Sequence, residues 1–173
     1  VLVCDFGKEV VGHPMLIGNA YAPLSVTVAA GEFEAECDKP YQPATSGVID
    51  RGAIRWMAPD RRAFRYVKFV IEPRGRMSID RIQAQLLEYP VSSFGSFECS
   101  DDMLNRIWDT SRHTLFLCMQ DYYEDGVKRD RLLWTGDLRV EALTGYYAYG
   151  LTGLARRGLM QLADIQLPDG LIP

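Results

Sequence analysis

The sequence predicts a multidomain β + α fold, in which an antiparallel β-sandwich over residues 1–92 precedes a helical domain over residues 93–173. Two observations predict this division. In the first part, apolar and polar residues alternate over short runs, which is the period of a half-buried strand. In the second part, apolar residues recur every three to four positions, which is the period of an amphipathic helix. The period changes near residues 91–95, so we place the boundary there.

Three segments of the first part carry the strand pattern most clearly. Residues 24–28 and 64–71 alternate and are rich in β-branched and aromatic side chains, and residues 79–86 form a further extended segment. Turn-forming residues separate these runs, at positions 30–31, 39–40, 46–47 and 73–75. Short strands at such spacing are typical of an antiparallel sandwich, and we expect no helix before residue 92.

Three helices are predicted in the second part. Ser100 is the expected N-cap of the first helix, which should end near Gln120. The second helix is expected over about 137–149, with Gly150 as its stop, and the third over about 152–163. Because the second helix is apolar almost all round, we expect it to be buried on most sides within a layered helical assembly.

Composition argues against several classes of function. The net charge is −4 with both signs well interspersed, so we expect no basic face for nucleic acid. No run approaches the roughly 18 apolar residues that a membrane-spanning helix needs. The four cysteines include no C-x-x-C pair and only two histidines are present, so we expect no metal, no cofactor and buried free thiols.

The two ends of the sequence resemble cut ends. The chain opens on a segment that has the pattern of a strand already under way, and it stops in a turn that points onward. We therefore expect both domains to be incomplete, the first at its amino end and the second at its carboxyl end, within a longer polypeptide.

The segment 122–137, between the first two predicted helices, concentrates the side chains that could carry chemistry. Four carboxylates, an arginine and a tryptophan of this segment are candidate site residues: Glu124, Asp125, Asp130, Asp137, Arg129 and Trp134. Glycoside hydrolysis needs one protonated acid and one ionised base, and local environment can hold two carboxyl groups in different states. The same composition also fits a solvated connector with weak surface ion pairs, so composition alone leaves both interpretations open.

The segment resembles the active-site loop of the glycoside hydrolase family 78 enzymes, the α-L-rhamnosidases, which is approximately Asp-Cys-Pro-x-Arg-(Asp)-Glu-Arg-x-x-Trp-x-Gly-Asp. Asp125 matches the leading aspartate, Arg129 the arginine, and Asp130-Arg131 the acid–arginine pair. The closing motif is matched by Trp134-x-Gly136-Asp137. Residues 95–108 resemble the beginning of that family's catalytic domain, and residues 5–12 and 64–67 resemble its preceding β-domain, in the family's order.

The resemblance implies a fold and an activity. Residues 93–173 would be the beginning of an (α/α)6 barrel, and the full-length protein would hydrolyse terminal α-L-rhamnose from glycosides or polysaccharides with inversion. By position, Asp130 stands where the family has its general acid. Asp125, Arg129, Trp134 and Asp137 match residues that hold the sugar, and no metal is implied.

Two departures from the family's pattern affect these expectations. The usual acid is a glutamate, and Asp130 is one methylene shorter, which would hold its proton about 1 Å or more further back. Either the backbone shifts inward, or Glu124 takes the role, or the chemistry differs. Gly126-Val127 replaces the Cys-Pro pair. The family's catalytic base is a glutamate further along the barrel, so we expect residues 1–173 alone to be inactive.

Two alternatives remain open from the sequence. The aspartate in place of glutamate also fits a carbohydrate-binding or catalytically inactive relative. A structural module is the third possibility, and it predicts no clustering of Asp125, Arg129, Trp134 and Asp137. A secreted or periplasmic location would suit a degrader of plant polysaccharides, although the sequence carries no signal that decides the compartment or the oligomeric state.

Overall fold

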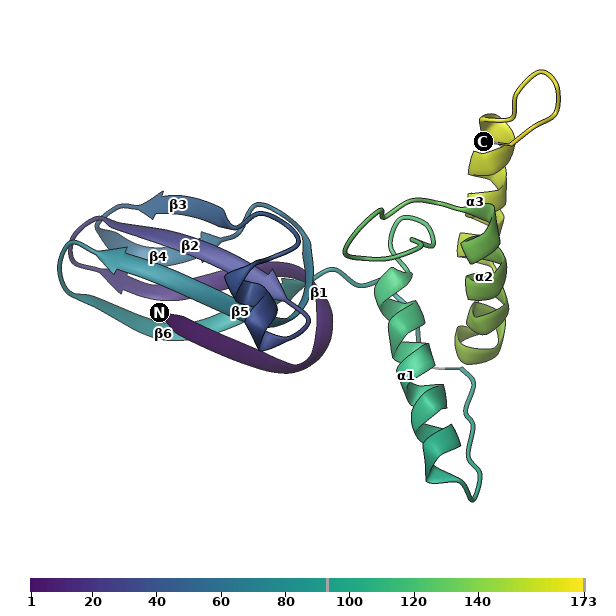
Figure 1. The fold of residues 1–173 in the computed structure, drawn as a ribbon, viewed down its shortest axis with the longest axis horizontal. Coiled ribbons are helices and arrows are strands. Elements are labelled where there is room, and N and C mark those ends of the chain that lie inside the picture. Colours follow the sequence, from purple (N-terminus) through teal and green to yellow (C-terminus); the bar gives the residue numbers. More distant parts are fainter. Residues whose placement is uncertain (93, 173) are drawn as a thin grey trace. The chain divides into compact units, whose positions relative to one another are not determined.

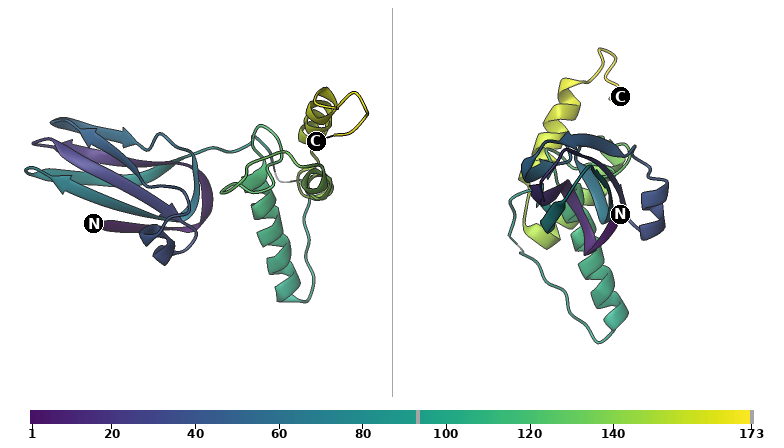
Figure 2. Two further views of the ribbon diagram at one scale, coloured as in Figure 1. Left: turned by 45° about the horizontal axis from the view of Figure 1, so that its top comes forward. Right: turned by 90° about the vertical axis from the view of Figure 1, so that its left-hand side faces the viewer.

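The computed structural model describes residues 1–92 and 94–172. The chain divides into two compact units, Val1–Leu87 and Glu88–Pro173 (Figure 1). The described residues of the first unit form six strands and a short 3₁₀-helix, and those of the second form three α-helices. Figure 2 shows the strands and the helices in two further views. The prediction of an antiparallel sheet followed by helices is confirmed.

The first unit is one curled antiparallel sheet organised around its long first strand. The sheet has the order β3-β2-β5-β1-β4, and β6 pairs with β1 outside this path. The first half of β1 pairs with β5, and its second half lies between β4 and β6. The strand bounds are β1 Leu2–Ala20, β2 Leu24–Gly31, β3 Thr45–Ile49, β4 Gly52–Met57, β5 Arg62–Pro73 and β6 Met77–Leu86.

A bulge in β1 accounts for part of the curl. The pairing of β1 with β5 shifts register between Asp5 and Val10, and Gly7 within this stretch has a φ of 80° that favours glycine. The Asp5 carboxylate accepts hydrogen bonds from the Gly7 amide at 2.7 Å and from Arg65 Nε at 2.8 Å. The Arg65 hydrogen bonds and then the Gly7 amide hold the pKa of Asp5 well below its ordinary value.

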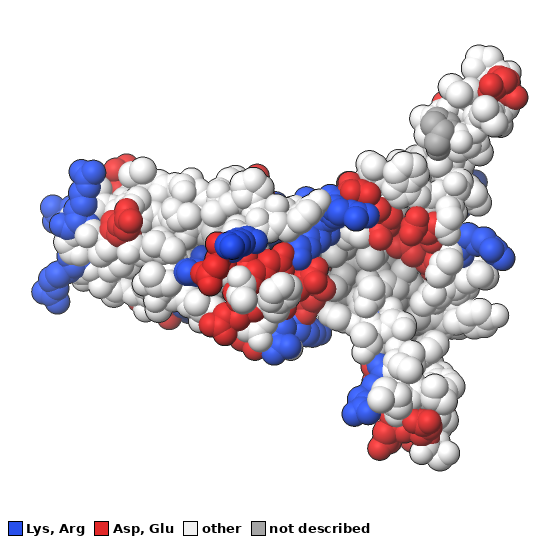
Figure 3. Space-filling view, viewed as in Figure 1, with Lys and Arg blue, Asp and Glu red and all other residues white. Residues whose placement is uncertain are grey.

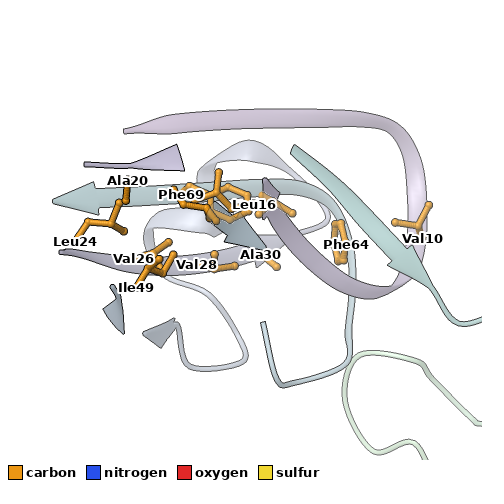
Figure 4. Close-up of a cluster of buried hydrophobic side chains, with 12 residues drawn as sticks. Val10, Leu16, Ala20, Leu24, Val26, Val28, Ala30, Ile49, Phe64 and Phe69 are labelled. Atoms are coloured by element: carbon orange, nitrogen blue, oxygen red, sulfur yellow. The ribbon is translucent and has the colours of Figure 1, made fainter. Parts of the chain in front are cut away.

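The interior of the curled sheet is apolar (Figure 4). Leu16 of β1, Val26 and Val28 of β2, and Phe64 and Phe69 of β5 are all fully buried. Their alternation with exposed or half-buried neighbours is the period-two pattern of a strand with one face in the core. Burying each such side chain contributes about 1.5–3 kcal/mol, so this cluster stabilises the unit.

Several elements of this unit were not expected. The turn predicted at 46–47 is wrong, because both residues lie within β3 and Gly47 packs against the indole of Trp56. A Cβ at Gly47 would lie 2.6 Å from Trp56 Nε1, so the glycine allows close packing rather than a turn. The expectation of no helix before residue 92 is also wrong, because Glu34–Asp38 forms the 3₁₀-helix η1.

Acidic side chains gather over η1, where Figure 3 shows them beside basic ones. Asp38 forms an ion pair with Lys68 of β5. Glu36 is buried, and its Oε2 accepts a hydrogen bond from the Glu32 amide at 2.9 Å. The acidic residues of this helix therefore hold the connection after β2 in place.

The second unit contains helices α1 Asp102–Cys118, α2 Thr135–Tyr149 and α3 Gly153–Asp164. Asp101, rather than Ser100, is the N-cap of α1, so that expectation is wrong. Its Oδ1 accepts hydrogen bonds from the amides of Met103 at 2.8 Å and Leu104 at 3.4 Å, which satisfies two otherwise unpaired donors. Gly150 has a φ of 60° and ends α2, as predicted.

Helix α2 buries only one face in this chain. Leu138 and Ala142 pack in an apolar cluster with residues of α1 and α3. On the opposite face, Val140 is 64% exposed and Tyr147 is 73% exposed. Within the described residues, the neighbours of α2 thus cover one face only. Burial of α2 on most sides was expected in a larger helical assembly, and it stays a prediction.

Two further properties bear on function. No described helix combines the length and the apolar character that crossing a bilayer requires. The four cysteines are free thiols, of which Cys37 and Cys118 are buried.

Candidate active site

The segment between α1 and α2 begins with a tight backbone turn. Met119 and Tyr123 form an isolated antiparallel bridge, and the Glu124 amide donates to the Cys118 carbonyl at 3.0 Å. These bonds continue the end of α1 into the segment, so its first residues are held by the helix. Figure 1 shows the segment as the green loop that joins α1 to α2.

Residues 125–132 form a closed loop. The Asp125 amide donates to the Leu132 carbonyl at 3.0 Å, and the Leu132 amide donates back to Asp125 Oδ1 at 2.8 Å. Within the loop, Arg131 Nε donates to the Val127 carbonyl at 2.9 Å, and the Tyr122 hydroxyl donates to the Arg131 carbonyl at 2.9 Å. Together these bonds fix the position of Asp125 at the neck of the loop.

A pocket of about 490 Å³ lies between α1, this segment and the beginning of α2. Three carboxyl groups line it: Asp125 from the neck of the loop, Asp137 from the first turn of α2, and Glu141 from the next turn. Asp137 and Glu141 are four residues apart, so they share one face of the helix. Hydroxyl groups complete the polar lining, from Thr110, Ser111, Thr114 and Thr144.

Glu141 was not anticipated from the sequence. Its Oε2 is buried and has no hydrogen-bond partner among the described residues. Burial first, and then the negative charges of Asp137, Asp125 and Glu124, raise the pKa of Glu141 to about 8. At neutral pH its carboxyl group is therefore mainly protonated, and it can both donate and accept a hydrogen bond.

The structure places the other expected site residues differently. Arg129 and Asp130 pair with each other, with 3.2 Å between Nε and Oδ1, and their side chains are 68% and 39% exposed. Neither is among the described residues that line the pocket. Trp134 is 45% exposed and directly precedes α2, whereas Glu124 is 6% exposed and buried.

The segment thus brings Asp125 and Asp137 into one pocket and leaves Arg129 and Asp130 as an exposed pair on the closed loop. Carboxyl and hydroxyl groups around a pocket can accept and donate hydrogen bonds to a ligand rich in hydroxyl groups. Among the residues that the structure describes, no group of three or more His, Cys, Asp or Glu side chains is arranged to hold a metal ion.

The sequence did contain a signal for Glu141. Glu141 follows Asp137 by four positions in a helix that is otherwise apolar almost all round. Residues four apart in a helix share one face, so an acidic residue four positions after the motif aspartate predicts a shared environment for the two carboxyl groups.

Comparison with known proteins identifies the relatives of this chain. Residues 92–173 match the family model described as the six-hairpin glycosidase domain of bacterial α-L-rhamnosidases. A curated α-L-rhamnosidase of Formosa agariphila is 28% identical over 105 residues, which are 61% of this chain and 11% of that protein.

Solved structures resemble both parts of the chain. The family 78 rhamnosidase of Bacillus sp. GL1 superposes with a TM-score of 0.83 and 31% identity, covering 94% of this chain and 18% of that protein. A rhamnosidase from Klebsiella oxytoca, solved with rhamnose bound, superposes with a TM-score of 0.82 and 27% identity, covering 93% and 35%. This chain thus spans about a third or less of the length of these relatives. Residues 92–173 are thus similar to the six-hairpin glycosidase domain of bacterial α-L-rhamnosidases, and the chain as a whole is similar to solved rhamnosidases, one of which is of glycoside hydrolase family 78.

Proposed function

We propose that the protein carrying this chain is an inverting glycoside hydrolase that releases terminal α-L-rhamnose from glycosides or polysaccharides. The observation that carries the proposal is the pocket in which Asp125 and Asp137, the first and last residues of the family motif, both take part. The similarity of residues 92–173 to the glycosidase domain of bacterial α-L-rhamnosidases supports the same substrate class.

In this proposal the pocket binds the sugar through its carboxylates. Asp125 uses Oδ1 for the Leu132 amide, but an ionised carboxylate can accept about four hydrogen bonds and so retains capacity for sugar hydroxyls. Asp137 lines the same pocket from the first turn of α2, and its carboxylate can accept hydrogen bonds from further sugar hydroxyls. Arg129 leaves its exposed ion pair with Asp130 and donates hydrogen bonds to the substrate instead. Trp134 provides an apolar surface against which the sugar ring packs.

Asp130 is the preferred general acid and Glu124 the alternative. Asp130 is exposed on the closed loop, where a glycosidic oxygen can approach it directly. Glu124 is 6% exposed, so the same oxygen could reach it only after the loop had opened. The shorter aspartate requires the substrate to approach about 1 Å closer than a glutamate would.

The general base lies outside the residues proposed here. In an inverting glycosidase, the base activates water on the face of the sugar opposite the acid, and the two carboxyl groups stand roughly 6.5–9.5 Å apart. The family resemblance assigns this role to a glutamate further along the barrel. We therefore propose that this chain supplies the acid and much of the sugar-binding site, and that it does not turn over substrate alone.

Two families of substrates test the assignment in the full-length protein. With an alkyl α-L-rhamnoside, whose leaving group needs protonation, Asp130→Asn should lower kcat by about 10²–10⁴-fold. With a nitrophenyl α-L-rhamnoside, whose leaving group departs unprotonated, the loss should be much smaller. Glu124→Gln is the matched comparison, and the same substrate-dependent loss in Glu124→Gln but not in Asp130→Asn would transfer the role to Glu124. Unchanged turnover in both variants would remove both residues from the mechanism.

The stereochemical outcome is tested separately. Proton magnetic resonance of the first-formed rhamnose distinguishes the anomers before they equilibrate. Release of the β-anomer from an α-rhamnoside supports inversion, whereas initial release of the α-anomer refutes it.

A carbohydrate-binding relative without hydrolytic activity is the second candidate, and the aspartate at position 130 favours it. Calorimetry with L-rhamnose and assays of the full-length protein separate the two. Binding that is weakened by Asp125→Asn, together with no turnover of any rhamnoside, would support the binding function over the enzyme.

A further inference from the structure

Two buried polar groups in the helical unit lack partners and influence each other. Glu141 Oε2 and the Tyr123 hydroxyl are both buried with no hydrogen-bond partner among the described residues. Tyr123 is fully buried, and its pKa is raised to about 12 by burial first and then by Glu141. Buried polar groups are hydrogen-bonded to protein groups or ordered water in the great majority of native structures, so an unpartnered carboxyl oxygen beside a pocket indicates that a hydrogen-bond partner is missing there.

We propose that Glu141 is a third sugar-contacting carboxyl group of the pocket, and that a hydroxyl group of the bound rhamnoside completes the hydrogen bonding of this carboxyl group. This inference rests on the proposed function and adds a substrate-positioning residue that lies outside the motif segment. Glu141 lines the pocket together with Asp125 and Asp137, which places it within reach of the same ligand.

A protonated Glu141 would complement the two aspartates. Ionised carboxylates only accept hydrogen bonds, so three of them would compete for the hydroxyl protons of one sugar. A neutral carboxyl group can instead donate to a hydroxyl oxygen while it accepts from a second hydroxyl. Besides burial, the groups that raise the pKa of Glu141 are Asp137, Asp125 and Glu124, all of which carry negative charge, so the neutral form is favoured near pH 7.

Substitutions in the full-length protein separate hydrogen bonding from charge. Glu141→Gln keeps a neutral group that donates and accepts, and L-rhamnose affinity should stay within about threefold of the wild type. Glu141→Leu removes the hydrogen bonds and should weaken binding about tenfold. Glu98→Gln makes the same chemical change on an exposed loop residue and should leave binding unchanged.

Monodeoxygenated methyl α-L-rhamnosides identify the contact. The analogue that lacks the hydroxyl bound by Glu141 should bind the wild type and Glu141→Leu with equal affinity, because neither complex contains the bond. The other analogues should retain the difference of about tenfold. Equal losses for every analogue would overturn the inference and indicate an indirect effect through the fold.

The pH profile supplies a readout that does not depend on the folding of Glu141→Leu. In the wild type, affinity should fall above about pH 8 as Glu141 ionises, and the profile of Glu141→Gln should be flat there. A fall that persists in Glu141→Gln would overturn the inference.

Asp125→Asn distinguishes failure of this inference from failure of the proposed function. If Asp125→Asn weakens rhamnose binding while Glu141→Leu does not, only the role of Glu141 is refuted. If neither variant changes rhamnose binding, the pocket is not the sugar site and both proposals fail.

Discussion

Substitutions at Gly145 of α2 test the packing of the helical unit. Gly145→Ala should lower the free energy of unfolding, and adding Tyr123→Phe should raise it again. A Cβ at Gly145 would lie 2.4 Å from the Tyr123 hydroxyl oxygen, 3.5 Å from Tyr123 Cζ and 3.9 Å from Leu115 Cδ2. Tyr123 is fully buried, so its ring cannot swing away into solvent. Gly145→Ala therefore forces the helix and the ring apart, and removing the hydroxyl should relieve the overlap.

The magnitudes follow from opposing contributions. Replacing glycine by alanine inside a helix stabilises it by about 1 kcal/mol, whereas forcing an extra methyl group into a packed core costs about 1–3 kcal/mol. We expect Gly145→Ala to lower the free energy of unfolding by about 1 kcal/mol. Tyr123→Phe removes a buried, unpartnered hydroxyl and should be neutral or stabilising by about 1 kcal/mol. The double variant should exceed the wild type by about 1 kcal/mol, because the nearest remaining atom lies at an ordinary contact distance.

Urea unfolding followed by far-ultraviolet circular dichroism measures all four members of this double-mutant cycle. Gly153→Ala is the control, because a Cβ there meets no atom within 4 Å, and it should not destabilise the helical unit. The reasoning is refuted if Gly145→Ala alone stabilises the protein, or if adding Tyr123→Phe does not restore the lost stability.

Three further predictions concern stability. The pKa of Glu141 is about 8 in the folded protein and 4.5 ordinarily. Between these two pH values the folded protein holds a proton that the unfolded chain has lost. The free energy of unfolding should therefore fall as the pH rises from about 4.5 to 8. The full pKa difference corresponds to about 5 kcal/mol, and solvent screening of this half-buried group reduces it to about 2 kcal/mol. Urea titrations at several pH values should show that Glu141→Gln abolishes this fall in the free energy of unfolding. An equal fall with pH in wild type and variant would contradict the prediction. Phe69→Ala should cost about 3–5 kcal/mol because its ring is fully buried in the sheet core, and a cost below 1 kcal/mol measured by thermal unfolding would argue against that core. Asp101→Ala should cost about 1 kcal/mol through loss of the α1 cap, whereas Ser100→Ala should have little effect, and the reverse order would restore Ser100 as the cap.

The sequence predicted the elements whose pattern is local. Residues 64–71 alternate because one face of β5 lies in the core, and Gly150 marks the end of α2 because it adopts a left-handed conformation. The length of β1 was not predictable in this way. Its pairing changes partners from β5 to β4 and β6 along the strand, so different faces are covered at different points and no single period persists.

The candidate site, too, was predictable where its pattern is local in the sequence and not where it depends on tertiary contacts. The family motif singled out the segment between α1 and α2, and the spacing from Asp125 to Asp137 can be read from the sequence. The presence of both in one pocket depends on the hydrogen bonds that close the loop at Leu132, which leave no sequence pattern. Glu141 was not predicted because it lies in α2, outside the motif segment 122–137. Ser100 and Asp101 are adjacent and chemically similar caps, and only the backbone decides between them.

The two hydrogen bonds between Asp125 and Leu132 join the ends of the loop and hold them independently of most side chains between them. Two of the three atoms that these bonds use besides the Asp125 carboxylate are backbone atoms of Leu132, so the side chains at positions 126–128 can be exchanged while Asp125 keeps its place. In the proposed mechanism, the length of the acid at position 130 can therefore change without moving Asp125. Libraries that aim to accept new leaving groups should vary positions 126–128 and keep Asp125, Arg131, Leu132 and the proposed site residues Arg129 and Asp130 constant.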